Sequence, residues 1–360
     1  MKKVMILAAA AVAAVGCTKI SYETEQAPVM PDVTAPVVFG AQTNVDVQSK
    51  VTQMEDGYVL GVYAFKNATV PTSNGAGAAD NALWVAGKKN VQYTWDDVNS
   101  VFSEEGTSTL FWPAKGESTQ LSFACYFPYS ASAVSDYTLT QDLSNQSAAP
   151  DYAFAWAKAE GVERPDPVSA HELTFDYKVA KLSLSIIADG TTIGSGTGIK
   201  MQEGGRGAGV VSVKVYGGGS DGFYKTYSLD LLTGTPSGTT NLTQGAPMTL
   251  KGVNQVGAAG KPSTLAYVDA IGYICPSDDA NLKSGGIVVA IEYNDGVSTQ
   301  IYTAELKNGT GSLSGDAAFE NGIVAAKNYK YTLKLGKTGI TFTGQVNDWT
   351  DVEGGEVDLQ

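Results

Sequence analysis

Short runs in which apolar and polar residues alternate dominate the chain from residue 37 onward. The clearest run covers 178–187, where Leu182, Leu184 and Ile186 alternate with Ser183 and Ser185. Strict two-residue alternation is typical of a β-strand that buries one face and exposes the other. An apolar repeat of helical period is almost absent, so the pattern predicts an all-β protein.

The predicted strands are short, rich in Val, Ile, Thr, Tyr and Phe, and separated by turns, which suits the 41 glycines of the chain. We expect strands at 37–39, 58–65, 120–126, 171–187, 210–216, 223–230, 266–274, 286–293, 300–305, 330–335 and 340–346. Two other stretches, 95–102 and 317–326, carry patterns that favour short helical turns.

The N-terminus has the features of an exported lipoprotein. Lys2 and Lys3 precede an apolar run over 4–15 that is too short to cross a bilayer comfortably as a permanent helix. Small residues then lead to Cys17, the arrangement in which a lipoprotein signal presents its cysteine for lipidation. We therefore predict a signal peptide over 1–16 and acyl chains such as palmitate on the cysteine. The alternative is an ordinary secreted protein with a chance cysteine near the cut.

Two stretches divide the mature chain. Residues 17–36 contain prolines and acidic residues without apolar periodicity, which is typical of a flexible linker. The remaining chain is longer than one hydrophobic core usually serves. A second stretch rich in proline and charge, 160–169, is typical of a connection between domains. We expect an N-terminal β-sandwich over 37–165 and a C-terminal β-sandwich over 166–360.

Charge and residue usage narrow the function classes. The formal net charge is −13 and no long basic cluster occurs, so we expect no nucleic-acid partner. His171 is the only histidine, and no pair of acidic residues stands out as catalytic. We therefore expect no enzyme activity, no cofactor and no metal. Cys125 and Cys275 either pair in an oxidising compartment or are two separately buried small side chains.

The tryptophans leave two interpretations open. Aromatic faces can form a sugar-stacking platform, which would make the chain a glycan-binding lipoprotein, whereas most tryptophans belong to a hydrophobic core. The residues concerned are Trp84, Trp95, Trp112, Trp156 and Trp349.

Several short segments occur along the chain in an order that is itself informative. After the lipoprotein signal come Val38-Phe39, Leu60-Gly61-Val62-Tyr63, Phe111-Trp112-Pro113, 121–128, 179–184, 274–276, 287–293, 328–333, 340–342 and Asp348-Trp349. In this order they resemble the fimbrillin family, the subunits of type V pili made by Bacteroides and Porphyromonas relatives. The resemblance covers nearly the whole mature chain.

The resemblance implies two successive transthyretin-like β-sandwiches and export to the outer membrane as a lipoprotein. It also implies that a trypsin-like protease cuts after the first strand, and that a C-terminal strand of a neighbouring subunit fills the groove left behind. On this sequence the first strand lies near 37–45 and the donated strand within 339–358. Its best apolar anchors are Ile340, Phe342 and Val346, which share one parity along a strand.

The expected maturation site departs from the family pattern. The family's loop commonly offers arginine, whereas the only arginines here are Arg164 and Arg206. Lys50 is the sole basic residue over 20–65, so the expected cut lies between Lys50 and Val51. Without that cut the first strand stays in place, and the chain is an anchor-like or otherwise unpolymerised member.

These expectations combine into one function and one alternative. The first is a structural subunit of a type V pilus (fimbria) at the outer membrane and cell surface. It is assembled with other pilus subunits after a protease acts, and it supports adhesion. The alternative is a non-polymerising surface lipoprotein that binds glycans. Shaft, tip and anchor roles, and the adhesion ligand, stay open at this point.

Overall fold

The chain is built almost entirely from β-strands. The computed structural model describes residues 31–43, 58–104, 109–134, 136–147, 154–188, 198–256, 266–310, 313–336 and 339–348. Within these ranges the only α-helices are α1 (Ala78–Ala82) and α2 (Ala280–Gly285), each little more than one turn. The all-β prediction is confirmed. None of the helices in the described ranges is long and apolar enough to span a membrane.

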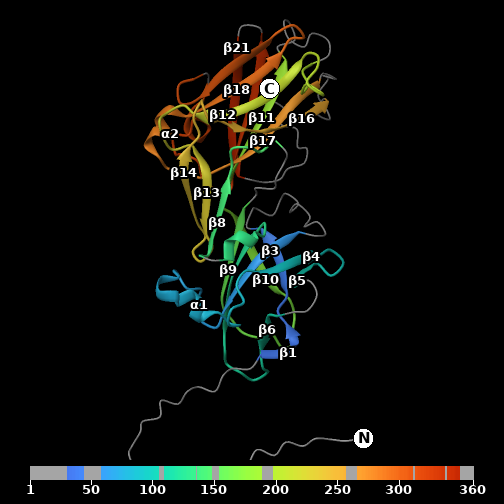
Figure 1. Cartoon of the computed structure of the whole chain (residues 1–360), viewed down its shortest axis with the longest axis vertical. Helices are drawn as coiled ribbons and strands as arrows, with labels where there is room; N and C mark the ends of the chain where they lie inside the picture. The colour runs from blue at the N-terminus through green and yellow to red at the C-terminus, as the bar shows by residue number, and fades with distance from the viewer. Residues whose placement is uncertain are drawn as a thin grey trace, which may run out of the picture.

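The strands form two lobes stacked along the long axis of the molecule, with a smaller sheet between them (Figure 1). The N-terminal lobe is a closed sheet of seven strands in the order β10-β2-β5-β4-β3-β7-β9. Its strands are β2 (Phe39–Thr43), β3 (Val59–Phe65), β4 (Val91–Asp96), β5 (Val101–Glu104), β7 (Leu121–Phe127), β9 (Ala155–Val162) and β10 (His171–Tyr177). A separate pair, β1 (Pro31–Pro36) and β6 (Phe111–Pro113), lies at the far end of this lobe (Figure 1).

The C-terminal lobe consists of a five-stranded and a four-stranded sheet. The first has the order β16 (Lys251–Val256), β17 (Ala266–Ile274), β11 (Ala180–Ala188), β20 (Lys327–Gly336) and β21 (Gly339–Asp348). The second has the order β15 (Met248–Thr249), β12 (Gly209–Gly217), β18 (Ile287–Asn294) and β19 (Thr299–Leu306). On β11, Leu182, Leu184 and Ile186 are buried as their alternation predicts.

A three-stranded sheet joins the lobes. It contains β8 (Thr138–Asp142), β13 (Tyr224–Asp230) and β14 (Thr235–Asn241), with β13 in the middle. β8 precedes β9 of the N-terminal lobe in sequence but pairs with β13 from the second half of the chain. The two halves of the chain are therefore interleaved at the joint.

The chain passes between the lobes after β10. The sequence predicts one strand over 171–187, but the structure has two, β10 and β11, which the two residues Lys178 and Val179 separate. The Lys178 N–H still donates to the Phe154 carbonyl, which extends the pairing of β10 with β9 by one residue. β10 follows the boundary expected at residue 165, yet it pairs with β2 and β9 of the N-terminal lobe. The chain therefore leaves the sheet of the N-terminal lobe after Tyr177 and enters the five-stranded sheet at Ala180.

The expected helical turn over 95–102 is wrong. Trp95 and Phe102 are opposite each other on β4 and β5, with ring centroids 4.9 Å apart. The Asp96 carboxylate accepts hydrogen bonds from the N–H groups of Val98 and Asn99, at 2.9 and 3.2 Å. A side chain that binds backbone groups two and three residues ahead favours a turn, so this segment is a hairpin.

Two strands of the N-terminal lobe, β3 and β7, are buried on both faces. Phe123 and Cys125 of β7 face the core inside the closed sheet, whereas Ala124 and Tyr126 face a second core that extends into the C-terminal lobe. The continuous apolar run of β7 follows from this double burial. Cys275 lies in the extended core, so the two cysteines are separately buried and both are free.

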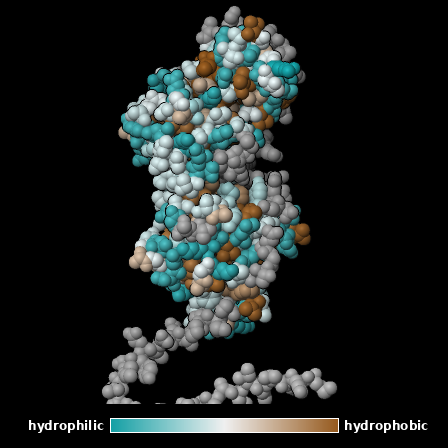
Figure 2. Space-filling view, viewed as in Figure 1, coloured by the Kyte–Doolittle hydropathy of each residue, from teal (hydrophilic) through white to brown (hydrophobic). Residues whose placement is uncertain are grey.

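Large apolar side chains on the surface are scattered. Figure 2 shows them as isolated brown residues among hydrophilic ones on the face in view. Among the described residues the most exposed are Val297, Val98, Val33, Val256 and Ile301. Single exposed apolar residues are ordinary for a folded protein.

Candidate assembly site: the first strands and the last strand

The candidate site has two parts, one in each lobe. The first is residues 31–43, called here the first-strand segment, which forms β1 and β2 in the N-terminal lobe. The second is β21, the last described strand, in the C-terminal lobe. Cys17, Lys50 and Val51 lie outside the described residues, so lipidation and cleavage stay predictions.

The side chains of the first-strand segment are deeply buried at alternate positions. Ala35, Val37 and Phe39 are 1%, 2% and 0% exposed. The Phe39 ring lies 5.1 Å from the Phe123 ring and 5.4 Å from the Tyr93 ring. Burying one such aromatic side chain stabilises the fold by about 1.5–3 kcal/mol. The segment is therefore part of the core of its lobe.

Backbone pairing holds the same segment unequally on its two sides. On one side, β2 pairs in parallel with β10 over five residue pairs, beginning with Phe39 opposite His171. On the other side, β2 has a single residue pair with β5, and β1 pairs with β6 in an irregular register at two positions. Pro31 and Pro36 have no N–H to donate. Side-chain burial, more than a continuous ladder, holds this segment.

One further backbone contact of the first-strand segment is made to Leu110, a residue that the Glu104 carboxylate holds in place. Val37 N–H donates to the Leu110 carbonyl at 3.0 Å. The Glu104 carboxylate accepts the N–H groups of Thr109 and Leu110, the latter at 2.9 Å. Glu104 thus orients the carbonyl that receives the first-strand segment.

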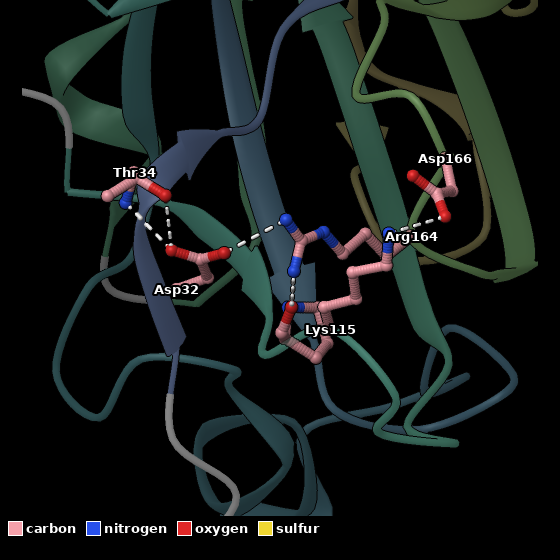
Figure 3. Close-up of polar contacts among 6 residues, drawn as sticks. Asp32, Thr34, Lys115, Arg164 and Asp166 are labelled. Atoms are coloured by element: carbon pink, nitrogen blue, oxygen red, sulfur yellow. Dashed lines mark hydrogen bonds and ion pairs between the residues drawn. The ribbon is translucent and has the colours of Figure 1, made fainter.

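The end of the segment is fixed by an ion pair (Figure 3). Arg164 Nη2 lies 2.9 Å from Asp32 Oδ2, and Nη1 donates to the Pro113 carbonyl at 3.3 Å. Asp32 Oδ1 accepts from the N–H and hydroxyl of Thr34, at 3.0 and 2.6 Å. These hydrogen bonds and the nearby guanidinium lower the pKa of Asp32, so the carboxylate stays charged near neutral pH.

Sequence reasoning missed this ion pair. It considers Arg164 only as one of two arginines in the search for the maturation cut, and it assigns Asp32 to a flexible linker. The two residues are far apart in sequence, and only the pairing of β1 with β6 and the course of the chain beyond β9 bring them together. The one available signal was the rarity of arginine.

Within the part of the chain that the structure describes, two tryptophans in the core of this lobe have a buried indole N–H without a hydrogen-bond partner. Trp112, which is fully buried on β6 beside β1, has an unpaired indole N–H, as does Trp95 on β4. Each unpaired buried donor costs roughly 1–3 kcal/mol. The packing around the first-strand segment is therefore incompletely satisfied.

The last strand is held very differently. β21 pairs antiparallel with β20 over ten consecutive residue pairs and forms the edge of its sheet. Ile340 is half-buried and packs against the core of the C-terminal lobe. The backbones of Ile340, Phe342 and Val346 are opposite Leu335, Leu333 and Tyr329 of β20. An edge strand has one row of backbone groups free to pair with another chain.

Other candidate residues do not gather into a site within the described residues. His171 is half-buried at the start of β10. Its backbone N–H donates to the Val38 carbonyl, and burial lowers the pKa of its side chain. No group of three or more His, Cys, Asp or Glu residues in the described ranges has a metal-binding arrangement.

The tryptophans seen in the structure do not form an exposed platform. Trp95, Trp112 and Trp156 are buried, and the Trp84 indole donates to the Phe111 carbonyl at 2.7 Å. Trp349 lies outside the described residues.

Comparison with known proteins relates the chain to fimbrial proteins in two ways. A family model described as fimbrillin-like matches residues 43–349. A Bacteroides uniformis protein named "Putative fimbrium subunit Fim1C" is 24% identical over 361 residues, covering 99% of this chain and 98% of that protein.

Solved structures share the fold. A "putative cell adhesion protein" from Bacteroides uniformis has a TM-score of 0.58 at 21% identity, covering 88% of this chain and 99% of that one. Another so described, from Bacteroides ovatus, has a TM-score of 0.56 at 17% identity, with the same coverage. Since the family model spans most of its length, the chain belongs to the fimbrillin-like family.

Proposed function

We propose that this chain is a structural subunit of a fimbria and that it supports adhesion. It is exported as an outer-membrane lipoprotein anchored at Cys17. A protease then cuts between Lys50 and Val51, and subunits assemble by donor-strand exchange with residues from the C-terminal segment 339–358. Its partners are other pilus subunits.

The observation that carries the proposal is the contrast within the first-strand segment. Its side chains fill the core, with Phe39 fully buried, whereas its backbone pairs sparsely with β5 and β6. Removing such a segment bares an apolar groove and the pairing edge of β10. An incoming strand regains both the apolar burial and the backbone hydrogen bonds, which is β-augmentation.

The position of the expected cut fits this process. Lys50 follows β2 and precedes β3 in sequence, so cleavage there separates the first-strand segment from the rest of the chain. The donated segment has to leave β20 or extend beyond it. β21 lies at a sheet edge, so its departure opens no interior strand position.

The test is intact mass and N-terminal sequencing of the protein recovered from the surface of its native cells. We expect a fragment that begins at Val51 in high-molecular-weight assemblies, and an acylated chain that begins at Cys17 among unassembled molecules. Lys50→Gln should abolish the fragment and the assemblies. Lys66→Gln is the matched control, because this exposed lysine lies just after β3.

Two outcomes would contradict the proposal. A lipidated chain starting at Cys17 in every fraction would indicate an anchor-like member or a separate surface lipoprotein. Normal assembly of Lys50→Gln would show that polymerisation does not depend on this cut.

A further inference from the structure

We propose that Arg164 is a specificity-determining residue for strand exchange, because it requires a carboxylate on the strand that occupies its lobe. The fitting occupant is the acidic C-terminal segment of a second copy of this chain. The inference rests on the proposed function and adds a recognition element to it. The surface that the first-strand segment covers is called the seat below.

One of the two contacts of Arg164 does not involve the first-strand segment directly. Its side chain is 17% exposed, and one arm donates to the Pro113 carbonyl of β6. The other arm points to the seat, where Asp32 now supplies a carboxylate (Figure 3). When the first-strand segment leaves, the guanidinium loses the one carboxylate with which it forms an ion pair among the described residues.

Neighbouring carboxylates do not readily replace Asp32. Asp166 lies 2.9 Å from the ammonium group of Lys115, and Glu163 accepts a hydrogen bond from Gln120 at 3.2 Å. A partly buried guanidinium without a counter-ion is unfavourable, whereas a charge-assisted hydrogen bond to a carboxylate is strong.

The C-terminal segment has the matching composition. Residues 339–347 are uncharged and include the apolar anchors of β21. Residues 348–358 contain five carboxylates and no lysine or arginine: Asp348, Asp351, Glu353, Glu356 and Asp358. The first-strand segment likewise joins a carboxylate to an apolar run, because its single acidic residue, Asp32, precedes the run from Ala35 to Phe39.

The order of the two runs fixes the direction of insertion. In the first-strand segment the carboxylate precedes the apolar run, and β2 lies parallel to β10. In the C-terminal segment the carboxylates follow the apolar run. The incoming strand therefore brings a carboxylate to Arg164 when it lies antiparallel to β10, the slightly more stable pairing mode.

The experiment uses the full mature chain with a specific protease site replacing residues around Lys50, so that the cut is made on demand. Release of the N-terminal fragment and growth of oligomers are followed separately by native mass spectrometry. Arg164→Gln should release the fragment faster and slow oligomer growth about tenfold, as expected for loss of a charge-assisted hydrogen bond. Arg206→Gln, on an exposed turn, is the matched control and should behave as the parent.

Two further variants separate recognition from a folding defect. Asp32→Asn should speed fragment release and leave oligomer growth unchanged, because Arg164 is intact. Arg164→Glu should fail to assemble with parent tails and recover when Asp351 and Glu353 are changed to Lys. A folding defect would not recover in this way.

The outcomes distinguish the two proposals. If the parent chain assembles and Arg164→Gln grows at the same rate, the inference is overturned and strand exchange stands. If neutralising the five tail carboxylates leaves growth unchanged, the acidic tail is not what Arg164 recognises, and the inference is likewise overturned. If the cut parent chain loses its fragment and never assembles, strand exchange itself fails, and the occupant named here fails with it.

Discussion

A single glycine allows the joint between the lobes to close. Gly234 has φ +68°, and a Cβ added there would lie 2.5 Å from the Trp156 ring. On the same ring, the indole N–H donates to the Leu231 carbonyl at 2.9 Å, and the Lys178 ammonium lies 5.1 Å from the ring centroid. Trp156 belongs to β9 of the N-terminal lobe, whereas Gly234 lies between β13 and β14. The missing side chain is what lets the indole approach.

Gly234→Ala should therefore destabilise the protein by roughly 2–4 kcal/mol, combining left-handed backbone strain with the clash against the indole. The measurement is chemical denaturation at equilibrium. Gly205→Ala is the matched control, because Gly205 has φ +69° and no atom within 4 Å of an added Cβ. It should cost only about 1 kcal/mol from backbone strain. Equal losses for the two variants would show that the Trp156 contact carries no weight.

At the scale of strands, the first-strand segment and β20 differ in how completely their backbones are paired with neighbouring strands. Five parallel pairs on one side and scattered contacts on the other hold β2, whereas β20 lies between two fully paired neighbours, β11 and β21. Local stability follows the number of buried contacts and continuous backbone hydrogen bonds around a segment. These two strands should therefore open at different free energies.

We expect the amide hydrogens of 37–43 to exchange at least about tenfold faster than those of 328–335 in the uncut chain. Hydrogen–deuterium exchange with mass spectrometry measures both peptides in one sample, so β20 is the internal reference. Equal protection of the two strands would mean that the first-strand segment opens only with the whole lobe. Its sparse pairing would then not be the property that makes it removable.

The strands predicted from alternation are present in the structure, because alternation depends only on neighbouring residues. The prediction left out β1, β4, β5, β6, β8, β9, β14, β15 and β16. Leu182, Leu184 and Ile186 are inside because a strand has a two-residue period and one covered face. The same reasoning did not predict that β8 pairs with β13, nor that β10 pairs with β2, because partner choice depends on contacts distant in sequence. The pairing of Asp32 with Arg164 was missed for the same reason. The backbone positions of Ile340, Phe342 and Val346 on a terminal edge strand agree with the strand predicted there.

For the whole molecule, the important feature is a core shared by both lobes. One hydrophobic cluster includes Tyr63 and Tyr137 from the first half of the chain together with Leu182, Tyr227 and Leu229 from the second. The Phe154 and Tyr227 rings stack across the joint, with centroids 4.9 Å apart. Separating the lobes would expose this apolar surface to water.

We therefore expect the chain to unfold in a single cooperative transition despite its length. Differential scanning calorimetry should give one peak whose calorimetric and van't Hoff enthalpies agree. Two resolved transitions, or a van't Hoff enthalpy near half the calorimetric value, would show that the lobes unfold independently and that the shared core is weak.

The order of the strands also has a mechanical consequence. β2 lies against β10, only Lys178 and Val179 separate β10 from β11, β11 lies against β20, and β20 lies against β21. A force on the strand in the seat is transmitted to β10 through the hydrogen bonds between these two strands, and the backbone carries it from β10 into β11. The hydrogen bonds of the β11–β20 and β20–β21 pairs then transmit the force to β21. Ladders loaded along their length resist in shear, with many hydrogen bonds sharing the load. Tension would cross this protein from the strand in the seat to β21 through paired strands and one two-residue connection, without stretching a long loop.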